Sequence, residues 1–174
     1  MERIIITPKT KIHDLLEAYP ELEETLIQAA PQFKKLRNPL LRKTIARVTS
    51  LSQAAIIGSV EVEKLINTLR EATGQQLQDD YIGEEISYNF EKPEWFLSNA
   101  ISSKIDISDM LNAGEQPVHE VLSALKKLKE GEILEINAPF IPAPLIDKAT
   151  GLDYDYWINE TAEDKFSVFF KKNI

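Results

Sequence analysis

The sequence predicts an α+β fold: a small N-terminal helical domain followed by a C-terminal βαβαββ two-layer sandwich. Apolar residues recur every three or four positions through the first 74 residues, as they do in helices that bury one face. From about residue 101 onward, short apolar runs alternate with amphipathic helix patterns, and the last two runs have a period of two. The 174 residues, 43% of them apolar, suffice for two small domains. We expect the helical domain over residues 1–74, a connector over 75–100 and the sandwich over 101–174.

Caps and prolines place the first helices. Thr10 is positioned to cap a helix over residues 11–18, because its hydroxyl can accept a hydrogen bond from a free backbone N–H. Pro20 opens a second helix, over residues 20–29, since proline suits the first helical turn. Residues 31–39 begin and end with proline, which predicts a loop or a single turn.

Three more helices complete the helical domain, and glycines mark the ends of the last two. A third helix follows Pro39 and turns three residues inward, namely Leu41, Ile45 and Val48. Residues 50–53 have the form of a capping box, so a fourth helix begins there, and Gly58 is its expected C-terminal cap. A fifth helix covers residues 61–72 and stops at Gly74.

The connector is acidic but also aromatic. Its polar start, residues 75–78, leads into acids at residues 79, 80, 84 and 85. Large apolar side chains, among them Trp95 and Phe96, are too numerous for a freely solvated linker. We therefore expect Trp95 and Phe96 to dock on the surface of a domain.

Strands and helices alternate in the last third of the chain. The predicted elements are a strand near Ile105 and Ile107, a helix over 118–129, a strand over 133–136, a short helix within 142–151, and strands over 154–158 and 166–170. A helical crossover makes the second strand parallel to the first, and the last two strands form a hairpin. We expect both helices to pack on one face of the sheet, because this is the simplest arrangement with two layers.

Composition excludes several classes of chemistry. The chain has no cysteine, so disulfides, thiolate nucleophiles and cysteine metal sites are unavailable. Its two histidines, His13 and His119, have no metal-binding spacing, and we expect neither a metal nor a cofactor. The longest apolar runs are too short to span a bilayer and the N-terminus lacks a signal-peptide pattern, so we expect a cytoplasmic protein without membrane contact. A net charge of −8 disfavours nucleic acid as a partner.

Two parts of the chain resemble bacterial families of unknown function. Residues 38–48, residues 51–55 and Gly58 are similar to domain of unknown function 1858, a helical family, and the resemblance extends over residues 3–74. Residues 105–172 resemble domain of unknown function 2249, whose fold is similar to the TusA/SirA sulfur carriers. The matching segments are residues 114–117, 122–125, 131–132 and 142–147. The resemblance implies a TusA-like fold for the C-terminal domain.

The sequence departs from the sulfur carriers at the position that does their chemistry. Such carriers place a Cys-Pro pair at the start of the first helix, where the helix dipole lowers the pKa of the thiol. Here that pair reads Gln116-Pro117, and an amide cannot form a persulfide. Sulfur carriage is therefore excluded for this chain.

The main electrostatic feature is a basic island within residues 32–60. This segment has six basic residues and no acidic one: Lys34, Lys35, Arg37, Arg42, Lys43 and Arg47. Lys43 and Arg47, four residues apart, are expected to share a helix face. The island could bind an anionic ligand or an acidic protein, because arginine forks suit bidentate anion binding. The alternative is an ordinary solvated helix face.

A second candidate site is a pocket or loop in the C-terminal domain, with Gln116, His119, Phe140, Pro142, Pro144 and Trp157. Three prolines in residues 139–144 fix an extended entry into the short helix, which is either a working loop or a rigid connection. His119 lies four residues after Glu115, so the two could pair as base and orienter, or simply cap a helix. No nucleophile accompanies them, and no catalytic residue is assigned.

These observations favour a non-enzymatic interaction or ligand-binding module with a sulfur-carrier-like fold that has lost its thiol. Its partner would be a protein or a small anionic ligand. An enzyme, or an enzyme accessory that uses carboxylates or a cofactor bound between the domains, is the alternative. The two helices around Gly58 leave a DNA-binding regulator as a third hypothesis, although Glu61 and Glu63 would meet the phosphates. The sequence leaves the oligomeric state open.

Overall fold

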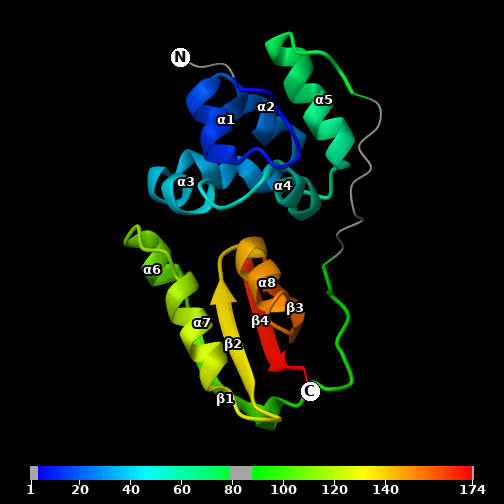
Figure 1. Cartoon of the computed structure of the whole chain (residues 1–174). Coiled ribbons are helices and arrows are strands. Elements are labelled where there is room, and N and C mark those ends of the chain that lie inside the picture. Colours follow the sequence, from blue (N-terminus) through cyan, green and yellow to red (C-terminus); the bar gives the residue numbers. More distant parts are fainter. Residues whose placement is uncertain (1–3, 79–87, 174) are drawn as a thin grey trace. The chain divides into compact units, whose positions relative to one another are not determined.

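The computed structural model describes residues 4–78 and 88–173. Figure 1 follows the chain through them. Contacts divide the chain into two units, residues 1–87 and 88–174, each of which is described by itself. The helical region comes first and a mixed sheet with helices follows, so the predicted α+β class is confirmed. The predicted boundaries of the domains, at residues 74 and 100, stay a prediction.

In its described residues, 4–78, the helical unit has six helical segments. They are α1 (Ile12–Ala18), α2 (Leu22–Ala29), the 3₁₀-helix η1 (Pro31–Arg37), α3 (Pro39–Ile45), α4 (Leu51–Ile57) and α5 (Val62–Thr73). Leucines and isoleucines at helical spacing form its core, including Leu15, Leu26, Leu51, Leu65, Ile66 and Leu69, all fully buried. The capping box predicted at the start of α4 is present, with Ser50 and Gln53 bonded to each other's backbone N–H.

Thr10 does not cap α1, contrary to the prediction. Its hydroxyl accepts a hydrogen bond from the backbone N–H of Thr7 at 2.9 Å instead. The first N–H groups of α1 are satisfied by backbone carbonyls from the α3–α4 connection, because Ile12 N donates to Thr49 O and His13 N to Ala46 O. A tertiary contact thus replaces the local cap.

The predicted inward face of α3 is only half right. Leu41, Ile45 and Val48 are half-buried, whereas Thr44 is fully buried. The Thr44 hydroxyl donates to Leu40 O at 3.0 Å, which satisfies it inside the helix. A small residue can therefore occupy the most buried position of α3.

The second unit is a four-stranded mixed sheet with helices. Its elements are η2 (Ser98–Ala100), β1 (Ile101–Asp106), α6 (Ser108–Asn112), α7 (Val118–Lys127), β2 (Ile133–Ala138), α8 (Ala143–Thr150), β3 (Tyr154–Ala162) and β4 (Lys165–Lys172). The strand order is β1-β2-β4-β3. β1 and β2 are parallel and β3 and β4 form a hairpin, as predicted. The short helix α6 was not predicted, and Ile107 lies after β1, where its N–H donates to Asn137 O.

The two faces of the sheet are covered differently. Tyr154 of β3 points to α7, since its hydroxyl donates to Leu125 O at 2.9 Å. Side chains alternate along a strand, so Trp157 lies on the opposite face. There it packs with Ile133 and Phe169, and the chain segment that precedes β1 covers this cluster with side chains that include Trp95 and Phe96. The expected docking of these two aromatic residues is confirmed.

Candidate anion-binding surface

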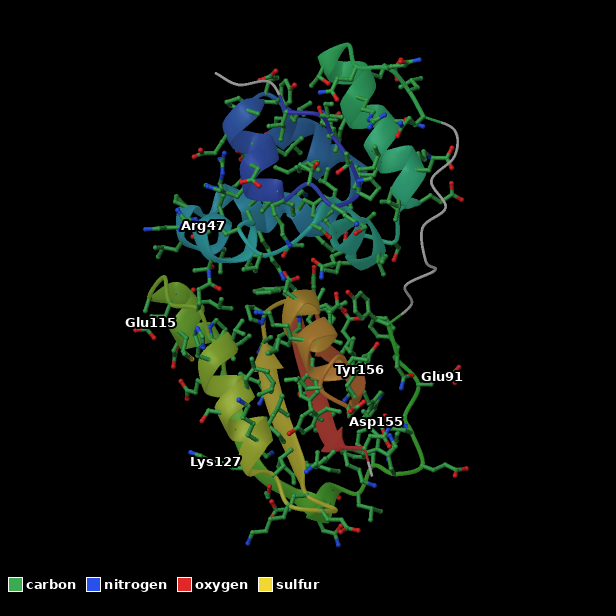
Figure 2. All side chains as sticks on the ribbon, in the orientation of Figure 1. Arg47, Glu91, Glu115, Lys127, Asp155 and Tyr156 are labelled. Carbon is green, nitrogen blue, oxygen red and sulfur yellow. The ribbon has the colours of Figure 1, made fainter. Side chains whose placement is uncertain are left out.

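The basic island is built on three consecutive pieces of the helical unit. Lys34, Lys35 and Arg37 belong to η1, Arg42 and Lys43 to α3, and Arg47 to the turn that follows α3 (Figure 2). The side-chain carbonyl of Asn38 accepts hydrogen bonds from Leu40 N and Leu41 N, and so fixes where η1 ends and α3 begins. α3 ends at Ile45, so Arg47 lies beyond the helix on which it was expected.

Arg42 and Arg37 are each paired with a carboxylate of the same unit. Arg42 Nη1 lies 2.7 Å from Glu23 Oε2, and Arg37 Nη2 lies 2.9 Å from Glu24 Oε1. Both glutamates belong to the first turn of α2, where they also suit the helix dipole. Packing of α2 beside η1 and α3 therefore neutralises part of the charge that the sequence segment shows by itself.

The other bases are differently placed. Lys34, Lys43 and Arg47 are exposed, and the described part of the chain gives them no ion pair. Lys35 is half-buried. These three exposed cations are the residues of the island best placed to meet an anion from solution.

One further base belongs to this surface and was missed. Lys11 Nζ donates to Val48 O at 2.7 Å, which brings its charge to the end of the α3 turn. A backbone bridge between Lys11 and Ser50 holds it there. Nothing local in the sequence indicates this contact, because 37 residues separate Lys11 from Val48.

The second candidate site is only partly assembled. β1 and β2 are parallel, so α6 and α8, which directly follow them, both begin at the carboxyl ends of these strands, and α7 begins beside α6 (Figure 1). Gln116 and His119, both exposed, lie around the start of α7, and Pro142, buried, with Phe140 and Pro144, half-buried, lies around the start of α8. Trp157 is not among them, because it lies within the sheet on the face away from α8, against Phe169.

A partly buried polar contact joins the start of the second unit to α8. The Tyr88 hydroxyl donates to Asp147 Oδ1 at 3.2 Å. Burial, and then the charge of Asp147, raise the pKa of Tyr88 far above its ordinary value of 10.0. Burial also raises the pKa of Tyr156, whose oxygen accepts a hydrogen bond from Asn89 N. Both tyrosines stay neutral at physiological pH and serve as structural hydrogen-bonding groups.

Metal binding and membrane spanning find no support in residues 4–78 and 88–173. Within them, no three side chains of His, Asp or Glu come together as a metal site would need. No helix there is long and apolar enough to cross a membrane.

Comparison with known proteins bears on the helical unit. Residues 6–66 match the family described as Domain of unknown function (DUF1858). The match runs from the segment before α1 into α5 and supports the resemblance inferred for the N-terminal part. No curated protein and no solved structure matches the chain. The resemblance of the C-terminal part to domain of unknown function 2249 stays a prediction.

Proposed function

We propose that the chain is a non-enzymatic interaction or ligand-binding module whose helical unit binds an anionic partner through Lys34, Lys43 and Arg47. The supporting observation is the placement of these exposed cations in a segment that has six bases and no acid, within a chain of net charge −8. The local potential is thus opposite in sign to that of the chain as a whole, which steers an anion to this surface.

The same proposal assigns a TusA-like fold to the C-terminal unit, with its sulfur chemistry lost. The parallel β1–β2 pair and the β3–β4 hairpin are consistent with such a fold. Pro117 directly precedes α7, and Gln116 stands where a carrier would have its thiol. With no cysteine in the chain, the sulfur chemistry of such carriers is unavailable, and we assign this unit a role in recognition instead.

Charge reversal in α3 and in the turn that follows it tests the binding proposal. Lys43→Glu with Arg47→Glu should weaken binding of a fluorescent polyglutamate peptide by about tenfold or more, because two attractions become repulsions. Arg42 is left unchanged, since its loss would free Glu23 and disturb the fold. Fluorescence anisotropy measures the affinity, and raising salt to about 0.5 M should weaken wild-type binding as screening shortens.

The matched control is Lys126→Glu with Lys127→Glu, which makes the same change in net charge in the exposed last turn of α7 (Figure 2). This pair should leave the affinity near that of wild type. An equal loss from both pairs would mean that only net charge matters, and the proposed surface would be wrong. Tighter binding of a DNA duplex than of the peptide would instead favour the regulator hypothesis.

A further inference from the structure

The outer edge of β1 is open to a further strand. β1 stands at one end of the strand order β1-β2-β4-β3, so β2 is its only strand partner in the described part of the chain. Residues 102–104 and Asp106 of β1 are exposed. The opposite end of the sheet is covered in part by the chain itself, because Asn89 O accepts a hydrogen bond from Ile158 N of β3. An edge strand whose backbone groups meet solvent is a template for pairing with another chain.

One hydrogen bond shows which residues of β1 offer their backbone groups outward. Ile107 N donates to Asn137 O, so the N–H of Ile107 points to β2. Backbone groups of successive residues in a strand point to alternate sides. Those of Ile105 therefore also face β2, whereas the N–H and C=O groups of Lys104 and of Asp106 face away from it. An added strand would form its hydrogen bonds with these two residues.

Lys104 and Asp106 also have opposite charges on the same face of the sheet. They are two residues apart, so both side chains point to the face that includes Glu135, which lies beside Lys104 in β2. Lys104 Nζ lies 2.9 Å from Glu135 Oε2, yet the lysine side chain is 63% exposed and its ammonium group can accept a second carboxylate as partner. Asp106 Oδ1 accepts a hydrogen bond from Ser108 N, which holds its carboxylate at the end of the strand. This edge is therefore complementary in charge to a second copy of itself.

Backbone geometry limits how two copies of β1 can pair. In an antiparallel pair, residues that point outward on one copy must lie opposite those that point outward on the other. Lys104 can then oppose Ser102, Lys104 or Asp106 of the second copy. Ser102 lies in the bulge that interrupts the start of β1, and two opposed lysines repel each other. The third register joins opposite charges on both sides of a two-fold axis and brings Ile105, which is half-buried, against Ile105 of the second copy.

We propose that two copies of the chain form a dimer through antiparallel pairing of β1, with Lys104 of each copy opposite Asp106 of the other. This inference goes beyond the proposed function, which lies in the helical unit. A lysine on an edge strand commonly prevents pairing, but the aspartate two residues later allows the one register in which the charges are complementary. The two four-stranded sheets would then form one continuous sheet. Because the paired segment is short, we expect a weak dimer with a Kd of about 10–100 μM.

Sedimentation equilibrium of the full chain at increasing concentrations tests this dimer. The wild-type chain should change from monomer to dimer as its concentration passes the Kd. Lys104→Glu places two carboxylates opposite each other in both pairs, and Asp106→Lys places two ammonium groups there, so each variant should dimerise about tenfold more weakly. A mixture of the two variants should recover dimer formation, because every opposed pair in the mixed dimer again has opposite charges.

Lys127→Glu and Glu130→Lys are the matched controls, since they make the same two charge changes at exposed positions near the end of α7. Both should dimerise like the wild-type chain, and circular dichroism checks that all four variants stay folded. A wild-type chain that is still monomeric at about 1 mM would overturn the inference and leave the edge of β1 to a strand from another protein. Equal weakening by the controls, or no recovery in the mixture, would show that Lys104 and Asp106 do not oppose each other. Neither result would affect the proposed function, which is measured by peptide binding to the helical unit.

Discussion

A β-carbon added at Gly58 would lie 2.7 Å from Ala30 Cβ and 3.3 Å from Ala54 O. Gly58 itself has φ −80°, which any residue can adopt. Gly58 is the C-terminal cap of α4, as predicted, but the glycine is required there by the close approach of α4 to the end of α2. Ser59, the next residue, takes the left-handed conformation instead, with φ 54°. This close packing also explains the glycine between α4 and α5 without DNA recognition.

Gly58→Ala should destabilise the helical unit by about 1–3 kcal/mol, because the new methyl group overlaps Ala30 and neighbouring backbone must move. Chemical denaturation followed by far-UV circular dichroism measures the loss. Ala30→Gly in the same chain restores the space, so the double variant should lose less than the sum of the two single losses. Strict additivity would show that the two positions do not touch. Gly151→Ala, with ordinary contacts at 3.5 Å, should cost little.

At the scale of elements, the segment before β1 behaves as part of the sheet unit. Asn89 O accepts a hydrogen bond from Ile158 N, and Phe90 O accepts one from Trp157 Nε1. Further along, the Phe96 ring centroid lies 4.7 Å from that of Trp157 and 4.6 Å from that of Phe169, both edge-on. Edge-to-face aromatic contacts add to the stabilisation from burial. The half of the predicted connector that begins at Tyr88 thus protects one edge and one face of the sheet.

Phe96→Ala should lower the free energy of unfolding of the sheet unit by about 2 kcal/mol, since a half-buried ring and its aromatic contacts are lost. Phe90→Ala removes a ring that is 53% exposed and should cost less than about 1 kcal/mol. The chain's two tryptophans, Trp95 and Trp157, both lie in this cluster, so urea unfolding followed by tryptophan fluorescence reports on this unit. Equal losses from both variants would show that the segment is not packed through Phe96.

Periodicity predicted the elements that bury one regular face and missed those that do not. β3 and β4 were predictable because Tyr154 and Ile158, like Val168 and Phe170, alternate with other residues. α6 was not, since only Leu111 of its five residues is buried and no period exists in so short a segment. The misplaced Trp157 was avoidable: if Tyr154 and Ile158 face the helices, alternation turns Trp157 to the other side.

The candidate site was less predictable than the fold. Clustering of the six bases is visible in the sequence, but their availability depends on α2, whose Glu23 and Glu24 take Arg42 and Arg37. These pairs span 19 and 13 residues, and no local rule relates their partners. The same is true of Lys11. The sequence shows where basic residues cluster, but tertiary packing decides which of them remain accessible to a partner.

At the scale of the whole molecule, the question is where one unit can be separated from the other. The predicted connector spans residues 75–100, yet each of its two described parts is held by contacts with one of the units. Gln75 accepts a hydrogen bond from Ile6 N and donates to Ile4 O in the helical unit. Residues 88–101 pack on the sheet unit through Tyr88, Phe90 and Phe96. Residues 79–87 lie outside the described part of the chain.

A protease site engineered between Gly83 and Glu84 should therefore release two fragments that each stay folded. Each fragment keeps the hydrogen bonds and apolar contacts of its own unit, including Gln75 in one and Phe96 in the other. A site between Trp95 and Phe96 is the control, because cutting there removes Trp95 from the aromatic cluster and should destabilise the sheet unit. Circular dichroism and tryptophan fluorescence of the purified fragments measure the outcome. If cleavage after Gly83 unfolds both fragments together, the two units are one cooperative domain.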